Sequence, residues 1–499
     1  MIINNSMFPA QFNYRSIADM RSDLDVLQQQ LSTGQKSQTL SGLGGDRVVD
    51  MTLRSRLSAL DSYKQNVDMV NIRINFMSTT MSRVDEIEGA ARASAQQGTY
   101  EINGVNMTAA QYLAETRMTE LIDLMNSELN GRHLFGGNET EKNPVEQFDA
   151  VMNGKDGKAG FRTVMAQRKM ADMGAANMGR LTTGIVGTAV SLSEDGTHPF
   201  GFKLDSLSSD GAAATLTGPA GAPPSLSVDF AAQPNDNERI IIGLDMPDGR
   251  TIQAQMKAVA GPPTSSNEFQ IGGTTAATAA NFKAALDTKL AELTKTDLVA
   301  ASAFAASDNF FAANGETTQR VDGPPYDTAT GLVAATDTDT VIWYTGQSAT
   351  NPRQTVDARV DENTRVSYGA QANEDGPTRL IRSLAVFAAE GFSPSDPDAK
   401  LKYQSLNNAV RDRLSESHNS EKGSIEVIQM ELGLAKTTNG RIAERQVQQK
   451  SMLDNMLVNI EEAPIEEVAM RILSLQTRMQ ASYQTASIVS KLSLVNYVQ

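Results

Sequence analysis

Both ends of this 499-residue chain carry apolar residues at alternating spacings of three and four, the pattern of a helix with one narrow apolar stripe. The two stripes consist of Ile17, Met20, Leu24, Leu27 and Leu31 near the start, and of Ile465, Val468, Ile472, Leu475, Met479, Val489 and Leu492 near the end. Such a stripe is stable in water only against a second helix, so we expect the two ends to pair.

The last helix has more apolar surface than one partner can cover. Its apolar face widens near the end to include Ile488, Leu494 and Val495 beside the stripe. Exposed apolar residues of this kind are a liability in an isolated acidic protein, whereas a polymer would bury them. We therefore expect self-assembly, and the alternative is a buried helix in a monomeric bundle.

Helical patterns continue inward from both ends. The N-terminal pattern resumes at Leu53 after a glycine-rich break and extends to Val84, and the C-terminal one runs from Ile425 to Ile460. A further helix is predicted from Met118 to Leu129, with Asn130-Gly131 as its C-terminal cap. The two ends thus predict a mainly α fold with an elongated helical coiled-coil stem.

The middle of the chain, from about residue 185 to 369, differs from the two ends in composition and in residue pattern. It is rich in Gly, Ala, Thr, Ser and Pro, and it alternates apolar and polar residues over short runs. A hairpin is predicted from residues 240–246 and 252–256, further strands at 200–204 and 226–230, and one helix with Phe282, Leu286, Leu290 and Leu293 on one face. We interpret this region as an inserted α+β domain.

The composition of the chain argues against several classes of partner and of chemistry. A formal net charge of −15 disfavours nucleic acid as a partner, and no run of apolar residues is long enough to span a membrane. The absence of Cys excludes disulfides and thiolate chemistry. Aromatics make up only 5% of residues, which argues against a wide, deeply packed core and favours narrow helix–helix seams.

No constellation of catalytic or metal-binding residues emerges. His133, His198 and His418 are far apart in sequence and lack ligand spacing. The loops at 235–238 and 337–339 lack the distal Glu of a calcium loop, and the glycines at 42–45 lack the Lys-Ser/Thr of a phosphate loop, so we interpret that segment as a helix–helix connector. We expect a protein that is not an enzyme and has no cofactor and no metal.

The first residues, MIINNSMFPAQFNYRS, lack the basic and apolar regions of a secretory signal peptide. If the protein leaves the cell, we expect a route that reads an uncleaved segment.

Several segments resemble the bacterial flagellin superfamily, which includes filament flagellins and hook–filament junction proteins. At the start these are LQQQLSTGQKSQTLSGLGGD at 27–46 and ELIDLMNSELNGRHLFGGNETEKNPV at 120–145. At the end they are VSYGAQANEDG at 366–376 and NIEEAPIEEVAMRILSLQTRMQASYQTASIVSKLSLVNYV at 459–498. The likeness covers roughly 300 residues at the two ends.

The resemblance implies a D0/D1 plan. Residues 1–40 and 464–499 would form D0, residues 41–184 and 370–463 the two halves of D1, and residues 185–369 an outer domain. It also implies an extracellular location in the flagellum, export by the flagellar type III route and an export chaperone. The partners would be copies of the same chain and other flagellar axial proteins.

Within the family, NGRHLFGG and the final LSLVNYV are similar to stretches typical of junction members. The segment SGLGGD replaces a S-x-x-D-D-A pattern found in both kinds of relative. We expect a subunit that joins hook to filament, next to a hook-side junction protein and flagellin. The alternative is flagellin itself, the bulk filament subunit.

Overall fold

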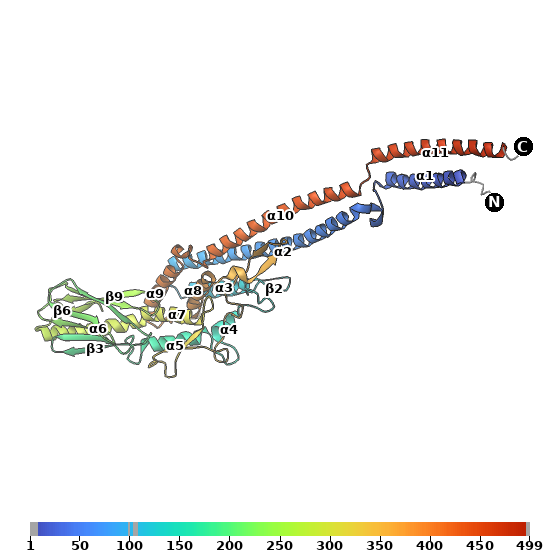
Figure 1. Cartoon of the computed structure of the whole chain (residues 1–499). Coiled ribbons are helices and arrows are strands. Elements are labelled where there is room, and N and C mark those ends of the chain that lie inside the picture. The colour runs from blue at the N-terminus through green and yellow to red at the C-terminus, as the bar shows by residue number, and fades with distance from the viewer. Residues whose placement is uncertain (1–7, 98–99, 103–107, 496–499) are drawn as a thin grey trace. The chain divides into compact units, whose positions relative to one another are not determined.

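The computed structural model describes residues 8–97, 100–102 and 108–495, although the side chains of residues 8–13, 97 and 489–495 lie outside this description. The fold combines α-helices, which predominate, with several small sheets (Figure 1). Contacts divide the chain into two compact units. Unit 1 contains the described residues within 1–70, 359–365 and 438–499, and unit 2 contains those within 71–358 and 366–437.

The helices are α1 (Phe8–Thr33), α2 (Arg47–Gln97), α3 (Ala109–Met125), α4 (Phe148–Asn153), α5 (Phe161–Met173), α6 (Thr275–Lys295), α7 (Asp297–Phe310), α8 (Asp375–Ala389), α9 (Ala399–Arg413), α10 (Ile425–Glu461) and α11 (Ile465–Val495). The longer strands are β3 (Leu181–Val186), β4 (Ala189–Glu194), β5 (Lys203–Ser209), β6 (Ala214–Ala220), β7 (Ser225–Phe230), β8 (Arg239–Asp245) and β9 (Thr251–Val259). The shorter strands are β1 (Glu128–Leu129), β2 (Arg132–His133), β10 (Glu268–Gln270), β11 (Gln319–Val321), β12 (Leu332–Ala334), β13 (Asp357–Arg359) and β14 (Arg365–Ser367).

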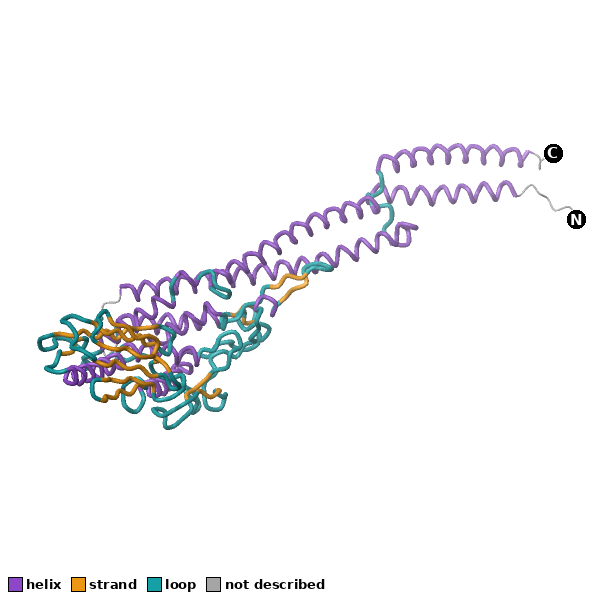
Figure 2. Tube along the Cα trace, turned by 60° about the vertical axis from the view of Figure 1, so that its left-hand side comes forward, coloured by secondary structure: helices purple, strands orange, loops and turns teal. Residues whose placement is uncertain are grey.

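Unit 1 is built from helical segments and residues 359–365 of the β13–β14 hairpin. Its α1 and α11 lie side by side in Figures 1 and 2. The glycine-rich stretch after α1 forms a short 3-10 helix (Leu40–Asp46), in which Gly44 has a φ of 57°. Glycine adopts a positive φ without a Cβ clash, so the chain turns there, and α2 begins at Arg47. The predicted connector between two helices is confirmed.

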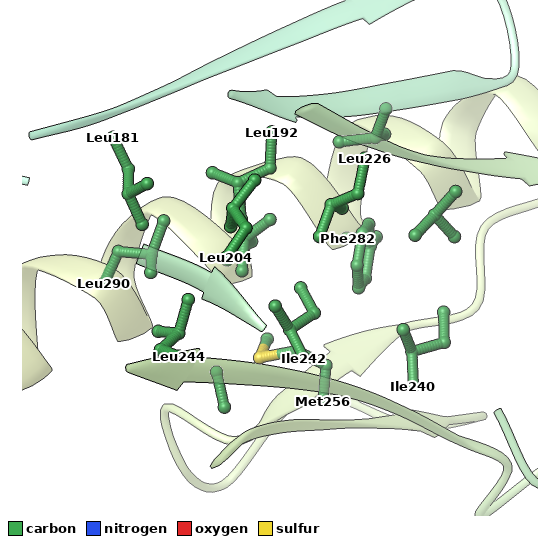
Figure 3. Packing of buried hydrophobic residues seen from close by; sticks show 14 of the residues in the cluster. Leu181, Leu192, Leu204, Leu226, Ile240, Ile242, Leu244, Met256, Phe282 and Leu290 are labelled. Carbon is green, nitrogen blue, oxygen red and sulfur yellow. The ribbon is translucent and has the colours of Figure 1, made fainter. Parts of the chain in front are cut away.

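Unit 2 contains two four-stranded sheets and a helix between their apolar faces. The strand orders are β3-β4-β7-β6 and β10-β9-β8-β5, and every pairing is antiparallel except that of β10 with β9. Side chains of both sheets meet those of α6, as Figure 3 shows for Leu192, Ile242 and Phe282. The predicted hairpin, the strand at 226–230 and the helix around Phe282 are confirmed.

The strand predicted at residues 200–204 begins later than expected. Phe200 and Phe202 are fully buried but precede β5, which starts at Lys203. Gly201 between them has a φ of 72°, so the backbone is not extended there. The alternation of apolar residues therefore correctly predicted that Phe200 and Phe202 are buried, but it wrongly predicted that they lie in a strand.

The helix predicted to end at Asn130-Gly131 ends instead at Met125. Leu129 lies in β1, which pairs with β2 in a hairpin whose two-residue turn is Asn130-Gly131. Both turn residues have positive φ, 55° and 71°, as a type I′ turn requires. The pair Asn-Gly is a signal for both helix caps and hairpins, and here the hairpin forms.

The expectation of little deep packing was wrong for unit 2. Among the described residues, the largest fully buried side chains are all aromatic, and they include Phe161, Phe311 and Trp343. Ring centroids of Phe161 and Phe311 lie 5.3 Å apart, and those of Phe311 and Trp343 lie 5.7 Å apart. The few aromatics are concentrated in one region, so the average over the chain was misleading.

Candidate functional site

The contact between α1 and α11 is an apolar seam. Leu24 and Leu27 of α1 pack against a cluster formed by Ala463, Val468 and Ile472. The three cluster residues are buried, with exposed fractions of 9% or less. Arg21 of α1 also lies over the ring of Tyr483, 6.0 Å from its centroid.

Backbone hydrogen bonds join residues 34–36, which follow α1, to residues 461–463, which precede α11. We call these two segments the clasp. The amide of Lys36 donates to the Glu461 carbonyl at 2.7 Å, and that of Ala463 donates to the Gly34 carbonyl at 2.8 Å. Gln35 and Glu462 form an antiparallel bridge. Because α1 ends at the clasp and α11 begins just after it, the two helices run antiparallel.

The structure brings most of the predicted stripe residues to the α1–α11 seam. Ile17, Val468 and Ile472 are buried, whereas Met20, Leu24, Leu27, Leu475 and Met479 are half-buried. Val489 and Leu492 belong to α11, but their side chains lie outside the described part of the chain.

Leu31 and Ile465 differ from the other stripe residues because they are 42% and 55% exposed. Both lie next to the clasp, where α1 approaches its end and α11 begins. At this level Ala463, which is 5% exposed, fills the position between the helices. The apolar spacing predicts which face these residues occupy but not how close the partner helix comes at the helix ends.

The far side of α11 is apolar as well. Met470, Leu473 and Ile488 are 70%, 64% and 58% exposed. At about 100° per residue these three lie roughly 140–200° around the helix from Val468, opposite the seam. Ile488 was among the residues noted from the sequence, but Met470 and Leu473 were missed. The only sequence signal is that both are apolar and fall off the stripe, which does not distinguish them from ordinary surface residues.

The parts of α2 and α10 that belong to unit 1 continue this exposed apolar character. On α2, Val48 and Met51 are 68% and 54% exposed, and on α10, Val447 and Met452 are 60% and 57% exposed. An isolated surface Leu or Val needs no explanation, but a repeated set along three helices of one unit is unusual. We call these residues, together with the exposed apolar residues on the far side of α11, the outward apolar surface.

Polar groups fix the inner contact of α2 with α10. Asn439 is fully buried and its amide donates to the Val67 carbonyl at 2.8 Å. Gln446 is 3% exposed and donates to the carbonyl of Val360, at the tip of the β13–β14 hairpin. Lys450 pairs with Asp61 at 2.6 Å. A buried amide in a helix seam favours one register, because any shift leaves it unsatisfied.

The three histidines are satisfied by local partners. His133 lies 2.8 Å from the Asn126 carbonyl, His198 lies 2.6 Å from Asp195, and His418 lies 2.7 Å from Glu421. The polar loops behave likewise. Glu238 accepts from the Asn235 amide at 3.0 Å, and Asp339 accepts from Thr336 at 3.1 Å. These carboxylates cap turns.

One group of carboxylates in unit 2 lies close together. Oxygens of Asp85, Glu88 and Glu426 lie within 4.8 Å of one another. Burial, reinforced by the charge of Glu426, raises the pKa of Glu88 to about 7, and Arg379 opposes that rise. The arrangement bears on stability, because it places like charges between α2 and α10.

Among the described residues, no helix combines the length and apolar character that crossing a bilayer requires. In comparisons with known proteins, no family model matches the chain and no curated protein matches it.

Proposed function

We propose that the chain is a structural subunit of the bacterial flagellum that joins hook to filament by self-assembly of its terminal helices. In this proposal α1 with α11, and α2 with α10, form a coiled-coil stem, and the domain around α6 faces outward. The subunit acts without catalysis and without a cofactor. Its position in the flagellum rests on the resemblance of its ends to junction members of the flagellin superfamily.

The outward apolar surface is the observation that carries the proposal. Helix α1 does not bury Leu473 and Met470, because they lie on the side of α11 opposite the α1–α11 seam. Burying each such side chain stabilises a complex by roughly 1.5–3 kcal/mol relative to exposure in water. Neighbouring copies would supply that cover, so the apolar far side favours assembly over a free monomer.

The same surface suggests how assembly is coupled to folding. Isolated amphipathic helices are marginal in water, so the terminal helices gain much of their stability from neighbours. We infer that the subunit is exported unfolded through the flagellar type III apparatus, with a chaperone covering its ends. Docking between a hook-side junction protein and flagellin then completes the terminal helices.

Deletion of the gene tests the position in the flagellum. Electron microscopy of the deletion strain should show hooks without filaments, and flagellin monomers should appear in the medium. Normal filaments on the deletion strain would contradict the proposal.

The deletion strain also separates this function from that of the bulk filament subunit. If the chain were flagellin, the deletion would remove the most abundant extracellular flagellar protein. Quantification of the shed protein by gel electrophoresis distinguishes the two outcomes, because a junction subunit leaves the flagellin pool intact.

A further inference from the structure

Strand β3 is an end strand of its sheet in unit 2. It pairs with β4 on one side, and no strand of the described residues lies beyond it on the other. In Figure 1 it lies at the margin of the sheet domain. An end strand presents backbone groups that another strand can pair with.

The register with β4 shows which groups face this open side. The amide of Asp195 donates to the Arg180 carbonyl at 3.1 Å, which makes residues 180 and 195 a hydrogen-bonded pair. Such pairs alternate along an antiparallel ladder, so 182, 184 and 186 also bond to β4. The backbone N–H and C=O groups of Thr183 and Ile185, and the C=O of Leu181, therefore point to the open side.

The other end strands of the two sheets carry protective features that β3 lacks. Strand β6 contains Pro219 and a register shift after Thr217, and β5 contains a bulge between Leu204 and Ser206. Strand β10 is only three residues long. By contrast, β3 pairs with β4 through six consecutive residues and contains no charge, proline or bulge.

The sequence of β3 is complementary to a second copy of itself. With Thr183 opposite Thr183 of the second copy, Ile185 lies opposite Leu181 on the face that carries α6. Ile185 is 39% exposed, so this register would cover it with an apolar neighbour. Gly184, between Thr183 and Ile185, leaves the opposite face of the strand without a side chain at its centre.

Charge also favours the same strand of a second copy as the partner. The chain has a net charge of −15, so two copies repel across most surfaces. Residues 181–186 have no charged side chain, and Asp287, which accepts from Thr183, is neutralised by Lys283 at 2.8 Å. A homotypic contact at β3 avoids the repulsion.

We propose that β3 is a homotypic docking strand, through which two copies join their sheets antiparallel about a two-fold axis at Thr183. Four backbone hydrogen bonds form, two between the Thr183 residues and two from the Ile185 amides to the Leu181 carbonyls. The contact is independent of the terminal helices, so its failure would leave the proposed flagellar function intact.

Disulfide trapping tests the register, and the absence of native Cys makes the test clean. The register places the two residues 183 about 5.5 Å apart between Cα atoms, within disulfide range. It places the two residues 186 roughly 20 Å apart, although Val186 is 84% exposed. In the full-length chain under mild oxidation, Thr183→Cys should form a covalent dimer at least tenfold faster than Val186→Cys. Equal rates, or a Thr183→Cys chain that stays monomeric, would overturn the proposal.

A second pair of variants guards against misfolding of the cysteine variant, which loses the Thr183 bond to Asp287. Ile185→Lys introduces a charge at the docking strand, and Thr217→Lys adds the same charge at the opposite end strand β6. Sedimentation of the full-length chains should show dimer loss for Ile185→Lys alone. Dimerisation of Ile185→Lys equal to that of Thr217→Lys would refute the docking strand.

Discussion

At the scale of single residues, Glu88 is the clearest case in which the fold changes the pKa of a side chain. Its carboxyl group faces Asp85 on its own helix and Glu426 on α10, and Arg92 and Arg379 supply opposite charge. Burial is the largest cause of the rise of its pKa from 4.5 to about 7. In the unfolded chain the same group would titrate near 4.5.

This difference predicts a pH dependence of unfolding. Between pH 4.5 and 7 the folded state holds a proton that the unfolded state has released, so stability falls as pH rises through that window. At 1.36 kcal/mol for each step of one in pKa, the loss is on the order of 3 kcal/mol above pH 7. Glu88→Gln should flatten the dependence in urea unfolding followed at pH 5 and pH 8.

The matched control for that variant is Glu86→Gln. Glu86 lies on the same helix, with a side chain that is 65% exposed and a surface pair with Arg83. Surface pairs contribute little, so this variant should keep the pH dependence of the wild type. A Glu88→Gln chain with the same slope as Glu86→Gln would show that burial does not hold the Glu88 proton.

At the scale of elements, a buried ion pair connects α5 to its surroundings. Arg168 pairs with Asp172 at 2.8 Å, and the side chains of both are at most 5% exposed. Arg168 also donates to Asn309 of α7 and to the Pro199 carbonyl, while Asp172 accepts from the Gly201 amide. The Arg168 guanidinium and the Asp172 carboxylate therefore each have a hydrogen-bond partner in addition to one another.

Removal of one partner should be far more damaging than removal of both. Arg168→Met leaves the Asp172 carboxylate buried without its counter-ion, which typically costs about 3–5 kcal/mol. The double variant Arg168→Met with Asp172→Leu should recover much of that loss. Arg162→Met on the same helix, where the pair with Glu115 is partly exposed, should cost about 1 kcal/mol. Urea unfolding followed by circular dichroism measures all three, and equal losses would contradict the buried-pair account.

The β1–β2 hairpin offers a second test at this scale. Gly131 has a φ of 71° and open space where a Cβ would stand, so the penalty for a side chain there comes from the backbone alone. Gly131→Val should destabilise unit 2 by about 1–2 kcal/mol, and Gly131→Asn should cost less, because Asn tolerates this conformation. Thermal unfolding of the two variants compares them. Equal melting temperatures would argue against a type I′ turn.

This hairpin illustrates how far the sequence determines the elements. Local patterns predicted α6, β7 and the β8–β9 hairpin, because in each the apolar period matches the buried face. They failed at Asn130-Gly131, where the same dipeptide suits a helix cap and a hairpin turn. The choice depends on the pairing of β1 with β2 and on the packing beneath it, which the dipeptide does not encode.

At the scale of the whole molecule, the sequence predicted the stripe residues of α1 and α11 but not the full candidate site. The stripe period identified Leu24, Val468 and Ile472 because it is a local property of each helix. The clasp at residues 34–36 and 461–463 joins segments more than 400 residues apart and leaves no periodic signal. Met470 and Leu473 were missed because, in the sequence, an apolar residue off the stripe resembles an ordinary surface residue.

In the proposed function, assembly is driven by the outward apolar surface and not by the seam inside one subunit. Leu473→Asp tests it because Leu473 is 64% exposed and lies opposite the seam, so the variant should fold normally. Val333→Asp is the control, since Val333 in β12 of unit 2 is 44% exposed and apolar.

The most direct measurement is the number of filaments per cell, counted by electron microscopy after each variant is expressed in the deletion strain. Assembly through the outward apolar surface predicts that Val333→Asp restores filaments and that Leu473→Asp, secreted and with wild-type circular dichroism, leaves bare hooks. Wild-type numbers of filaments on cells that express Leu473→Asp would contradict it.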